Sequence, residues 1–411
     1  MKLFPQEHNP MKILEINKFN YVRGGAEKHF LDLVRLLKNK GHEVAVFSME
    51  HPQNEFSPWK KYFVSYVGYD VSDSLWQKIK GTARIFYSIE ARIKIKKLLD
   101  DFQPDIVHIH NIYHQISPSI LTEIKKRKIP IIMTVHDYAL ICPDHLYQCN
   151  GFDCAKLGKD KYWEFIIKKG FKNSYVKSVL VVLEKMVHDF FQLYEKNIDL
   201  YICPSEFMRK KIVAAGIAAE KTTVIPHFFQ PSAIRAVEDI EVGEKYIFHF
   251  GRLSKGKGVD RLIRVVKSIP NLKLYLAGKI EDDLVIPNDS RIKYLGFLNA
   301  EKILEYIKQS LFVVSFSKLS ETFGLIALEA NSSGKPFVGY RTGALSEIVE
   351  NNRTGCLCSN EADIKMQIER LVRDDGLRIL FSRNALKNAE KFNAENFYKK
   401  IMQVFLTAKI K

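Results

Sequence analysis

The chain has 411 residues, of which 46% are hydrophobic and 27% are charged. This composition excludes a disordered chain, and the length is sufficient for two domains that each bury a core. The net charge of +16 predicts an anionic partner such as a phosphate, a lipid surface or a nucleic acid. No apolar run reaches the roughly 18 residues of a membrane span, and the first ten residues lack the apolar core of a signal peptide. We therefore expect a cytoplasmic protein in which residues 1–10 are an extension.

Short apolar runs alternate with stretches of helical periodicity from Met11 onward. Such alternation is typical of a doubly wound parallel sheet, in which ligands bind at the carboxyl ends of the strands. The predicted strands of the first half are 13–16, 43–48, 106–110, 131–135, 200–203 and 223–228, and the predicted helices include 26–40 and 205–216. Polar residues that directly follow these strands are therefore candidates for binding and catalysis.

Gly24 and Gly25 directly precede the first predicted helix. A double glycine often forms only a tight turn, but it also lets backbone N–H groups approach a diphosphate. The pair does not belong to a Gly-x-Gly-x-x-Gly motif, which argues against an NAD or FAD site. The two glycines are therefore candidates for binding phosphate.

Two neighbouring strands end in the dipeptides His110-Asn111 and His136-Asp137. A single histidine at a strand end is more often structural than catalytic. Two such dipeptides near a double glycine instead favour a functional site. All four residues are therefore candidate site residues.

Cys142, Cys149 and Cys154 cluster around His145. A small metal site is one interpretation, although the spacing matches no standard zinc pattern. The alternative is that they are ordinary thiols. Six cysteines in a chain of this length do not indicate a disulfide framework.

A basic segment lies between residues 60 and 98. It contains nine basic and only three acidic residues, and the basic residues are interleaved with Trp76, Phe86 and Tyr87. Interfacial helices combine these residue types, so one hypothesis is that this face docks on the inner leaflet of a membrane. The alternative is a solvated basic helix that packs on its own domain. Residues 156–177 have the same character. The basic residues are Lys60, Lys61, Lys78, Lys80, Arg84, Arg92, Lys94, Lys96 and Lys97.

Residues 231–244 are polar and acidic, and we predict that they link two domains. The first domain is then 1–230 and the second 245–390, followed by a terminal segment, 391–411, that contains a helix at about 394–408. In the second domain we predict strands at 246–250, 274–278, 292–297, 311–314 and 335–340, a helix at 259–269, and two or three helices after residue 356.

The loop after the strand 246–250 contains Arg252, Lys255 and Lys257 among three glycines. The glycines give the backbone room, and the cations can bind an anion above the loop. Arg252 and Lys257 are the preferred candidates, and Lys255 is a competing cation.

The segment 316–330 is the most informative part of the sequence. It reads as a strand end, a polar loop with Glu321, and a helix that begins at Thr322 or Phe323 and is capped by Ser320 or Thr322. The first N–H groups of this helix would bind a phosphate or a sugar oxygen. Glu329 would lie roughly two turns along the helix, so that both carboxylates line one cleft. The alternative for each carboxylate is an exposed residue or a partner of the helix dipole.

The spacing Glu-x7-Glu within 320–330 resembles the carboxylate motif of the retaining, nucleotide-sugar-dependent glycosyltransferases of family 4. The match continues from about Met11 to Gly355. It includes a glycine-rich donor loop at Gly24-Gly25, a His-Asp dipeptide at His136-Asp137, and an Arg…Lys-Gly loop at Arg252…Lys257. The chain departs from the family at 227–229, where His-Phe-Phe replaces a more common Asn-Gly, and at Gly256, where the family usually has a larger polar residue.

The resemblance implies a GT-B fold: two Rossmann-like doubly wound parallel-sheet domains that face each other across a cleft, with the terminal helix packed on the first domain. It further implies that His136 faces the donor sugar, that Arg252 and Lys257 hold the diphosphate, that Glu321 binds the sugar and that Glu329 binds the ribose. The implied catalytic residues are Glu321, His136, Arg252 and Lys257; the implied donor-binding residues are Gly24, Gly25, Arg252, Lys257, Glu321, Thr322, Phe323, Gly324, Leu325 and Glu329; and the acceptor-side candidates are His110, Asn111 and Asp137.

The expected function is transfer of a hexose-type sugar from a UDP-sugar or GDP-mannose to a glycan or lipid-linked acceptor, with retention of configuration, in cell-surface polysaccharide or lipopolysaccharide synthesis. No metal cofactor is expected, because protein cations can neutralise the leaving group and no convincing Asp-x-Asp site is present. No nucleic acid partner is expected, because no nucleic-acid motif is present. The alternatives are a sugar-nucleotide epimerase, a phosphorylase, a basic nucleic-acid-binding protein and a non-catalytic sugar-binding protein. The expected location is cytoplasmic, with peripheral attachment to the inner membrane face under the docking hypothesis.

Overall fold

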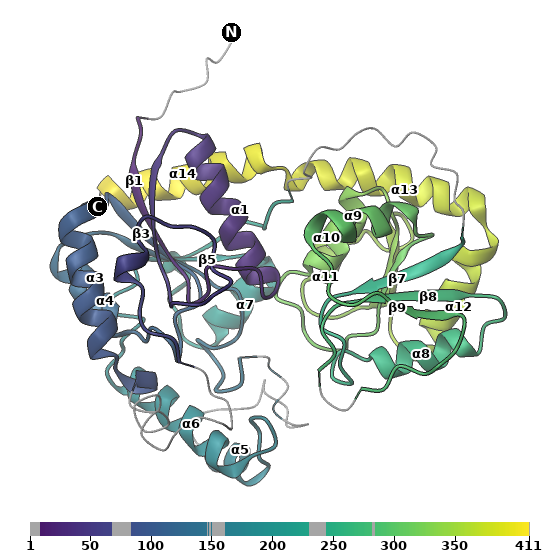
Figure 1. Cartoon of the computed structure of the whole chain (residues 1–411), viewed down its shortest axis with the longest axis horizontal. Coiled ribbons are helices and arrows are strands. Elements are labelled where there is room, and N and C mark those ends of the chain that lie inside the picture. The colour runs from purple at the N-terminus through teal and green to yellow at the C-terminus, as the bar shows by residue number, and fades with distance from the viewer. Residues whose placement is uncertain are drawn as a thin grey trace. The chain divides into compact units, whose positions relative to one another are not determined.

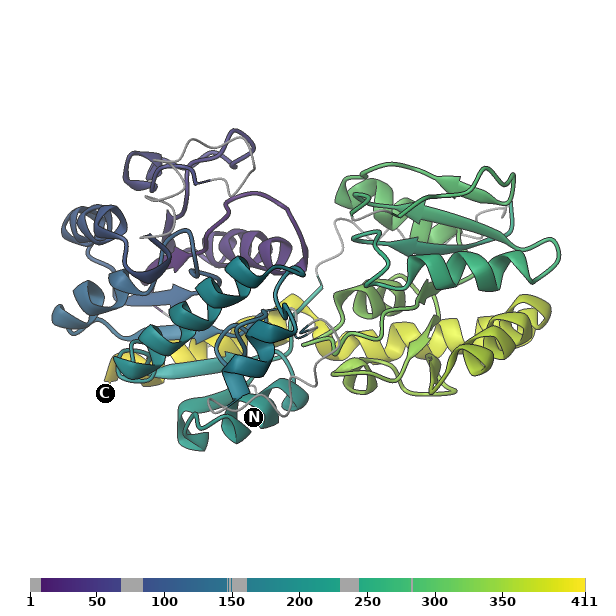
Figure 2. The same ribbon diagram turned by 90° about the horizontal axis from the view of Figure 1, so that it is seen from below.

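The chain folds into two compact units. In the computed structural model, the described residues are 9–67, 84–145, 147, 149, 161–229, 244–281 and 284–410. Unit 1 comprises Met1–Pro204, Arg209–Ile225 and Tyr398–Lys411, and unit 2 comprises Ser205–Met208 and Pro226–Phe397. Each unit contains a six-stranded sheet flanked by helices (Figures 1 and 2). Of the predicted linker, 231–244, only Glu244 lies among the described residues.

The sheet of unit 1 is parallel throughout, as predicted, with the order β2-β1-β3-β4-β5-β6. Every position of β3 and β4 is buried, which explains their unbroken apolar runs. Because β1, β3 and β4 are adjacent and parallel, the residues that follow them meet at one edge of the sheet. The strands are β1 (Lys12–Ile16), β2 (Glu43–Phe47), β3 (Ile106–Ile109), β4 (Ile131–Thr134), β5 (Leu200–Cys203) and β6 (Thr222–Val224).

The helices of unit 1 begin where the sequence offers good caps. Ser88 accepts a hydrogen bond from the Ala91 N–H at 3.1 Å at the start of α3, and Ser174 caps α6 through the Lys177 N–H. The elements are α1 (Gly25–Asn39), η1 (Lys60–Tyr62), α3 (Ile89–Phe102), α4 (Ser119–Lys126), α5 (Tyr162–Ile167), α6 (Tyr175–Phe190), α7 (Glu206–Ala214), whose first residues belong to unit 2, and η5 (Ala219–Lys221).

The last helix, α14 (Ala394–Ile410), contributes its residues from Tyr398 onward to unit 1. His42 Nδ1 accepts a hydrogen bond from the Met11 N–H at 3.1 Å, so its Nε2 carries the proton that is donated to the Tyr398 hydroxyl at 2.8 Å. The Phe405 ring packs edge-on against His108, with 5.5 Å between the ring centroids. The end of the chain is therefore part of the core of unit 1. In the part of the chain that the structure describes, no helix is both long and apolar enough to cross a bilayer.

The sheet of unit 2 is also parallel and has the order β12-β11-β10-β7-β8-β9. Neighbouring residues of its strands belong to two different core clusters; for example, Ile247 packs in one cluster and Phe248 in the other. Both faces of the sheet are therefore covered. The strands are β7 (Tyr246–Phe250), β8 (Lys273–Ala277), β9 (Ile292–Tyr294), β10 (Val313–Ser315), β11 (Phe337–Tyr340) and β12 (Gly355–Cys358).

Strand β12 was not predicted, because helices were expected from about residue 356 onward. It pairs with β11 from Phe337↔Gly355 to Tyr340↔Cys358 and extends the sheet by one strand. The helices of unit 2 are α8 (Val259–Lys267), α9 (Ala300–Gln309), α10 (Leu325–Ser332), α11 (Leu345–Ile348), α12 (Glu361–Arg373), α13 (Asp375–Ala389), η6 (Glu390–Phe392) and the first residues of α14.

Candidate active site

The loops after β7 and β8 approach each other through two glycines. Gly251 and Gly278 have φ angles of 122° and 140°, and a Cβ on Gly278 would lie 1.7 Å from the Gly251 carbonyl oxygen. The Leu253 N–H donates to the Lys279 carbonyl at 2.9 Å and joins the two loops. Arg252 extends from this support. Its side chain is 41% exposed and lies 3.7 Å from Glu281, so the guanidinium is accessible to an anionic ligand.

Lys257 lies at the start of α8, just before Gly258. Gly258 adopts a left-handed conformation with φ 73°, and a Cβ there would lie 2.3 Å from the Phe316 carbonyl oxygen. The Lys257 N–H donates to Ser254 Oγ at 3.2 Å. From this position Lys257 Nζ reaches Glu321 Oε1 at 2.6 Å. Two of the predicted site residues are therefore in direct contact, with side chains 20% and 26% exposed.

Hydrogen bonds from two other segments of the chain fix the backbone of the loop that carries Glu321. Ser205 Oγ donates to the Thr322 carbonyl at 2.6 Å, and the Ala344 N–H donates to the Glu321 carbonyl at 2.9 Å. Gly343 has φ 56°, and a Cβ there would lie 2.2 Å from the Glu321 carbonyl oxygen. The backbone of Glu321 is therefore fixed by contacts that are distant in sequence.

Helix α10 begins later than predicted. It begins at Leu325, with Gly324 as a left-handed N-cap (φ 106°) and no side-chain cap, so the predicted caps Ser320 and Thr322 are wrong. Glu321 therefore lies in the loop before the helix, whereas Glu329 lies within the helix and is buried. These positions agree with the prediction, which put Glu321 in a polar loop and Glu329 on the helix. Because the helix begins at Leu325, Glu329 lies about one turn along it rather than roughly two.

Two buried histidines in unit 2 were not identified from the sequence as site residues. His249 of β7 donates from Nδ1 to the Val314 carbonyl at 2.8 Å, and burial, together with the charge of Lys257, lowers its pKa to about 4. His227 packs against the Phe323 ring with 5.0 Å between centroids, and burial lowers its pKa to about 3. Both imidazoles are neutral at pH 7, so neither offers a cation to a diphosphate.

In unit 1, α1 begins at Gly25 and its N-cap Gly24 has extended backbone without a side-chain cap. The buried carboxylate of Glu27 lies in the first turn, and burial raises its pKa against the opposing effect of Lys18. Burial lowers the pKa of Lys18, and the carboxylates of Asp137 and Glu27 oppose that shift. Lys18 and Glu27 therefore influence each other electrostatically near the double glycine, which no motif indicated.

Asn111 and Asp137 are connected through Tyr113. The Tyr113 hydroxyl lies 2.9 Å from Asn111 Oδ1 and 2.8 Å from Asp137 Oδ1. The Ala139 N–H also donates to Asp137 Oδ1, at 3.0 Å, and Asn17 Oδ1 accepts from the Asn111 N–H at 3.1 Å. Burial raises the pKa of Asp137. The structure therefore brings two predicted acceptor-side residues together through a tyrosine that sequence reasoning missed.

His110 and His136 are also in contact, with 2.7 Å between His110 Nδ1 and His136 Nε2. His110 Nε2 lies 2.9 Å from the buried Glu15. Among the described residues, Glu15, His108 and His110 form the group whose ligand atoms lie close enough together, within 4.8 Å, to hold a metal ion.

A pocket in unit 1 opens beside Tyr113, between the loops after β3 and β4 and the inner face of α6. The buried hydroxyls of Tyr194 and Tyr201 line it and have no hydrogen-bond partner among the described residues. Glu184 pairs with His114 at 2.9 Å. A cavity with unsatisfied hydroxyls and a polar pair of side chains can accommodate a polar ligand such as a sugar.

Of the cysteine cluster considered from the sequence as a small metal site around His145, the structure describes Cys142 and Cys149. Cys142 Sγ lies 3.5 Å from Cys149 Sγ, but Cys149 is disulfide-bonded and so cannot supply a thiolate. Cys154 lies outside the described residues.

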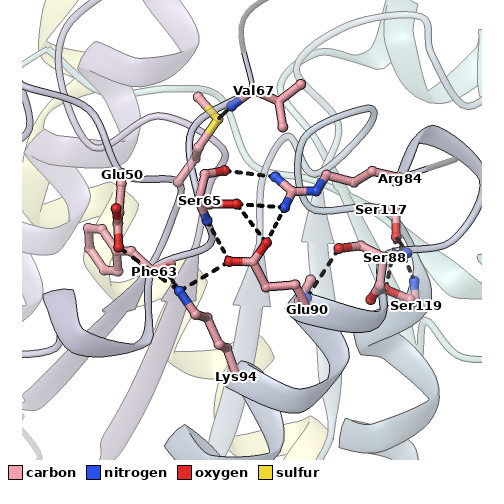
Figure 3. A network of polar contacts seen from close by, with 12 residues as sticks. Glu50, Phe63, Ser65, Val67, Arg84, Ser88, Glu90, Lys94, Ser117 and Ser119 are labelled. Atoms are coloured by element: carbon pink, nitrogen blue, oxygen red, sulfur yellow. Dashed lines mark hydrogen bonds and ion pairs between the residues drawn. The ribbon is translucent and has the colours of Figure 1, made fainter. Parts of the chain in front are cut away.

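Two cations of the basic segment, Arg84 and Lys94, are engaged within unit 1, as Figure 3 shows. Arg84 is buried, donates to the Ser65 carbonyl at 2.7 Å and pairs with Glu90. Lys94 lies 3.2 Å from the other Glu90 oxygen and donates to the Phe63 carbonyl. Burial acts to raise the pKa of Glu90, but hydrogen bonds from Ser65 and the charge of Arg84 outweigh it, so the pKa is lowered.

Other cations of the segment have partners as well. Arg92 pairs with Glu123 at 2.6 Å and Lys61 with Asp101 at 3.5 Å. Lys78 and Lys80 lie outside the described residues, as do Trp76 and the rest of 68–83. Arg84 and Lys94 are therefore internal structural cations, and the segment offers fewer charges to a membrane than its sequence indicated.

Comparison with known proteins identifies the family. The model of Glycosyltransferase Family 4 matches residues 23–232, and that of Glycosyl transferases group 1 matches residues 231–388. The chain therefore belongs to glycosyltransferase family 4. An uncharacterized glycosyltransferase of Methanocaldococcus jannaschii is 25% identical over 402 residues, which cover 96% of this chain and 98% of that protein.

Two further similarities concern sugar and lipid chemistry. The alpha-monoglucosyldiacylglycerol synthase of Streptococcus pneumoniae is 24% identical over 259 residues, covering 57% of this chain and 58% of that protein. The crystal structure of HepE from Anabaena in complex with UDP-glucose has a TM-score of 0.64 at 18% identity and covers 97% of this chain and 100% of that chain. The predicted GT-B class and the predicted glycosyltransferase activity are thus confirmed.

Proposed function

We propose that the protein transfers a hexose from a nucleoside diphosphate sugar to a glycan or lipid-linked acceptor with retention of configuration. The proposal is carried by the contact between Lys257 and Glu321, which lie 2.6 Å apart at the donor side of unit 2. In the reaction the bond between the anomeric carbon and the diphosphate oxygen breaks, and its electron pair leaves with the diphosphate. The acceptor oxygen bonds to that carbon, and its proton passes to the departing diphosphate. The reaction therefore needs a cation for the leaving diphosphate and a carboxylate for the electron-poor sugar.

The named residues supply these groups. Arg252 and Lys257 offset the charge of the diphosphate, and Glu321 binds sugar hydroxyls and the positive charge that develops at the anomeric carbon. Glu329 binds the ribose. With two protein cations at the donor side, we expect transfer without a metal ion, so that a chelator leaves the rate unchanged.

The donor is tested by screening UDP- and GDP-sugars for release of nucleoside diphosphate, in buffer with EDTA. We expect slow hydrolysis of one donor, which is lost in Glu321→Gln. Recovery of an epimerised nucleotide sugar would instead identify an epimerase, and phosphate-dependent release of a sugar phosphate would identify a phosphorylase. Sugar affinity without any donor turnover would contradict the proposal.

We further propose that the acceptor is lipid-linked and that α6 docks on an anionic lipid surface. On its outer face α6 exposes Val176, Val179, Leu183, Met186 and Phe190, which are 36% to 80% exposed. Their spacing of three and four residues places them on one stripe. Few soluble surfaces expose such a stripe unless it binds a partner or a membrane.

The neighbouring charges favour a lipid surface over an apolar protein partner. Lys168, Lys172 and Lys177 are exposed in the segment from the end of α5 to the first turn of α6, and Lys169 lies 4.7 Å from the Tyr175 ring centroid. Figure 1 shows that α5 and α6 are neighbours. Each cation near an anionic leaflet contributes about 1 kcal/mol. Exposed aromatic residues beside lysines are typical of helices that lie in the interface. We name this outer face of α6, with the four lysines, the α6 surface.

The inner face of the same helix connects this surface to the acceptor. Val181, Glu184, Lys185 and His188 line the pocket beside Tyr113. A lipid-linked sugar whose lipid lies in the leaflet would reach this pocket across a single helix. The alpha-monoglucosyldiacylglycerol synthase among the similar proteins is named for a sugar-bearing lipid, which supports an acceptor of this kind. We propose that the pathway is synthesis of a cell-surface polysaccharide, lipopolysaccharide or glycolipid.

Co-sedimentation with anionic and neutral vesicles at low and high salt tests the α6 surface. The double variant Leu183→Glu and Met186→Glu should lose binding to anionic vesicles, whereas Met366→Glu, at an equally exposed methionine of α12, should retain it. Equal binding by all proteins would contradict the proposal. Salt-insensitive self-association that the double variant abolishes would instead identify an interface between copies.

A further inference from the structure

A continuous chain of hydrogen-bonded side chains crosses the sheet of unit 1. His108 Nε2 lies 2.8 Å from Thr134 Oγ1, and His108 Nδ1 lies 3.0 Å from a carboxylate oxygen of Glu15. The same oxygen lies 2.9 Å from His110 Nε2, and His110 Nδ1 lies 2.7 Å from His136 Nε2. Glu15, His108 and His110 are completely buried, and His136 is 8% exposed. We name these five residues the Glu15 chain.

The chain has one consistent arrangement of protons when Glu15 is ionised. A carboxylate only accepts hydrogen bonds, so His108 carries its proton on Nδ1 and His110 carries its proton on Nε2. The remaining lone pair of His108 accepts the Thr134 hydroxyl. The lone pair of His110 lies on Nδ1, so the nitrogen facing it, Nε2 of His136, must carry a proton. The lone pair of neutral His136 is then on Nδ1.

We infer that Glu15 acts through His110 as a positioning group for His136. It fixes which nitrogen of His136 carries the proton, and it supplies the negative charge that stabilises a protonated His136. A buried carboxylate behind a histidine has this double effect in hydrolases, where it holds the tautomer and balances the imidazolium. Nothing in the sequence motifs assigned a role to Glu15, which lies inside β1.

The buried carboxylate of Glu15 explains why protonation of His136 is favoured. With all three histidines neutral, the side chains of the Glu15 chain carry a net charge of −1 on the buried carboxylate of Glu15, and a buried charge is unfavourable unless an opposite charge pairs with it. A proton taken up by His136 cancels that charge. Among the described residues, His29 of α1 also faces these rings, with its ring centroid 5.7 Å from that of His136 and 6.4 Å from that of His110. Phe30, which packs edge-on against His110, and Phe405, which packs edge-on against His108, are apolar.

A metal ion is the competing explanation, because Glu15, His108 and His110 could ligate one. A bound metal would require both facing nitrogens to be unprotonated, whereas the Glu15 chain requires both to carry protons. The two explanations therefore differ in a measurable property. Elemental analysis of the purified protein gives a first answer, and a stoichiometric metal that is lost in His108→Gln would overturn the inference.

The direct test is NMR of protein labelled with ¹⁵N-histidine, with signals assigned through His110→Asn, His108→Gln and His136→Gln. We expect the Nδ1–H tautomer for His108 and the Nε2–H tautomer for neutral His110 and His136. In Glu15→Gln the pKa of His136 should fall by about one unit or more, because the compensating charge is lost. Thr134→Val removes only the hydroxyl at the far end and should leave the His136 signals unchanged.

His110→Asn separates the two effects if Glu15→Gln folds poorly. The amide oxygen of the new asparagine can replace His110 Nδ1 and still accept the His136 proton, so the tautomer of His136 should be retained. The link to Glu15 is removed, so the pKa of His136 should fall. An Nδ1–H tautomer for neutral His136 in the native protein, or an unchanged His136 pKa in both variants, would overturn the inference.

The consequence for turnover rests on the proposed function. Glu15→Gln should lower kcat about tenfold or more and change the KM for the donor by less than about twofold, and Thr134→Val should do neither. The expected NMR result without turnover of any nucleotide sugar would leave the inference intact and reject the proposed function. Turnover of a nucleotide sugar, together with an unaltered tautomer and pKa of His136 in the variants, would support the proposed function and reject the inference.

Discussion

Lys257 Nζ lies 2.6 Å from Glu321 Oε1, although the two residues are 64 positions apart in the sequence. The pair balances its own charge, so neither group lies unpaired in the half-buried donor side. Under the proposed function, a donor would replace this contact, with a phosphate oxygen binding Lys257 and a sugar hydroxyl binding Glu321. The contact would then hold the cation and the carboxylate in place until the donor binds.

Glu321→Gln should lower the rate of transfer by about 100-fold or more, because the amide cannot stabilise the positive charge at the anomeric carbon. Affinity for the nucleoside diphosphate should be retained or increased, since Lys257 is released from its partner. Transfer assays and calorimetry measure the two effects. Glu305→Gln, which removes an exposed carboxylate paired with Lys302 at 2.8 Å, is the control and should change neither. Weaker nucleotide binding in Glu321→Gln would contradict the assignment.

Arg252→Ala should weaken binding of the nucleoside diphosphate. The side chain is 41% exposed, so screening by solvent reduces the loss to about 1–2 kcal/mol, roughly a 5- to 30-fold rise in Kd. Calorimetry with UDP and GDP gives the value. Arg264→Ala removes an arginine of α8 that is 65% exposed and paired with Asp260, and it should have no effect. Equal affinities of Arg252→Ala and the native protein would rule out a diphosphate contact.

Glu329→Ala should raise the KM for the donor while leaving kcat nearly unchanged. A ribose contact is made equally in the ground state and the transition state, so its loss affects binding rather than the chemical step. Steady-state kinetics with varied donor separates the two constants. The opposite result, a large fall in kcat at constant KM, would exchange the roles of Glu329 and Glu321.

The sequence predicted the elements that burial determines. The strands Leu200–Cys203 and Tyr246–Phe250 begin and end where their apolar runs do. The strand β12, Gly-Cys-Leu-Cys, was missed because glycine and cysteine are weak signals of a strand and its pairing partner is β11. The start of α10 was misplaced because Gly324 adopts a left-handed conformation, which tertiary contacts around the Glu321 loop stabilise.

Within the candidate site, the sequence identified the residues that belong to motifs. It did not identify Tyr113, which connects Asn111 to Asp137, or Glu15, which connects to His136 only through His110. These residues acquire their neighbours when parallel strands bring distant positions to one edge of the sheet. A single sequence carries no signal for such a juxtaposition.

The stability of unit 2 should fall as the pH decreases from about 6.5 to about 4. Burial lowers the pKa of His249 to about 4 and that of His227 to about 3, so the unfolded chain binds protons in this range that the folded protein does not. Each histidine then reduces the free energy of unfolding by about 2 kcal/mol at pH 5 relative to pH 7.5. Above the unfolded pKa the contribution is fully retained. Urea unfolding at the two pH values measures the difference.

His249→Asn provides the control for this pH dependence, because asparagine can still donate to the Val314 carbonyl but does not titrate. The difference in the free energy of unfolding between pH 5 and pH 7.5 should be about 2 kcal/mol smaller in the variant than in the native protein. Identical differences in the variant and the native protein would show that His249 does not cause the effect.

Gly343→Ala should disrupt the donor side without touching a substrate. The residue has φ 56°, and its new Cβ would lie 2.2 Å from the Glu321 carbonyl oxygen and 2.4 Å from the Glu321 nitrogen. The backbone of Glu321 has to move, and the left-handed conformation itself becomes unfavourable by about 1 kcal/mol or more. We expect transfer to fall at least about tenfold and the melting temperature to decrease.

Gly376→Ala is the matched control for this prediction. Gly376 lies in α13 with a negative φ, and its Cβ would meet only the Asp374 carboxylate, at 3.5 Å. Alanine in a helix is more favourable than glycine by about 0.5–1 kcal/mol, so this variant should melt slightly higher and retain full transfer. If Gly343→Ala retained native activity, the backbone contact between Gly343 and Glu321 would not determine the position of the carboxylate, and the role of the loop would have to be rejected.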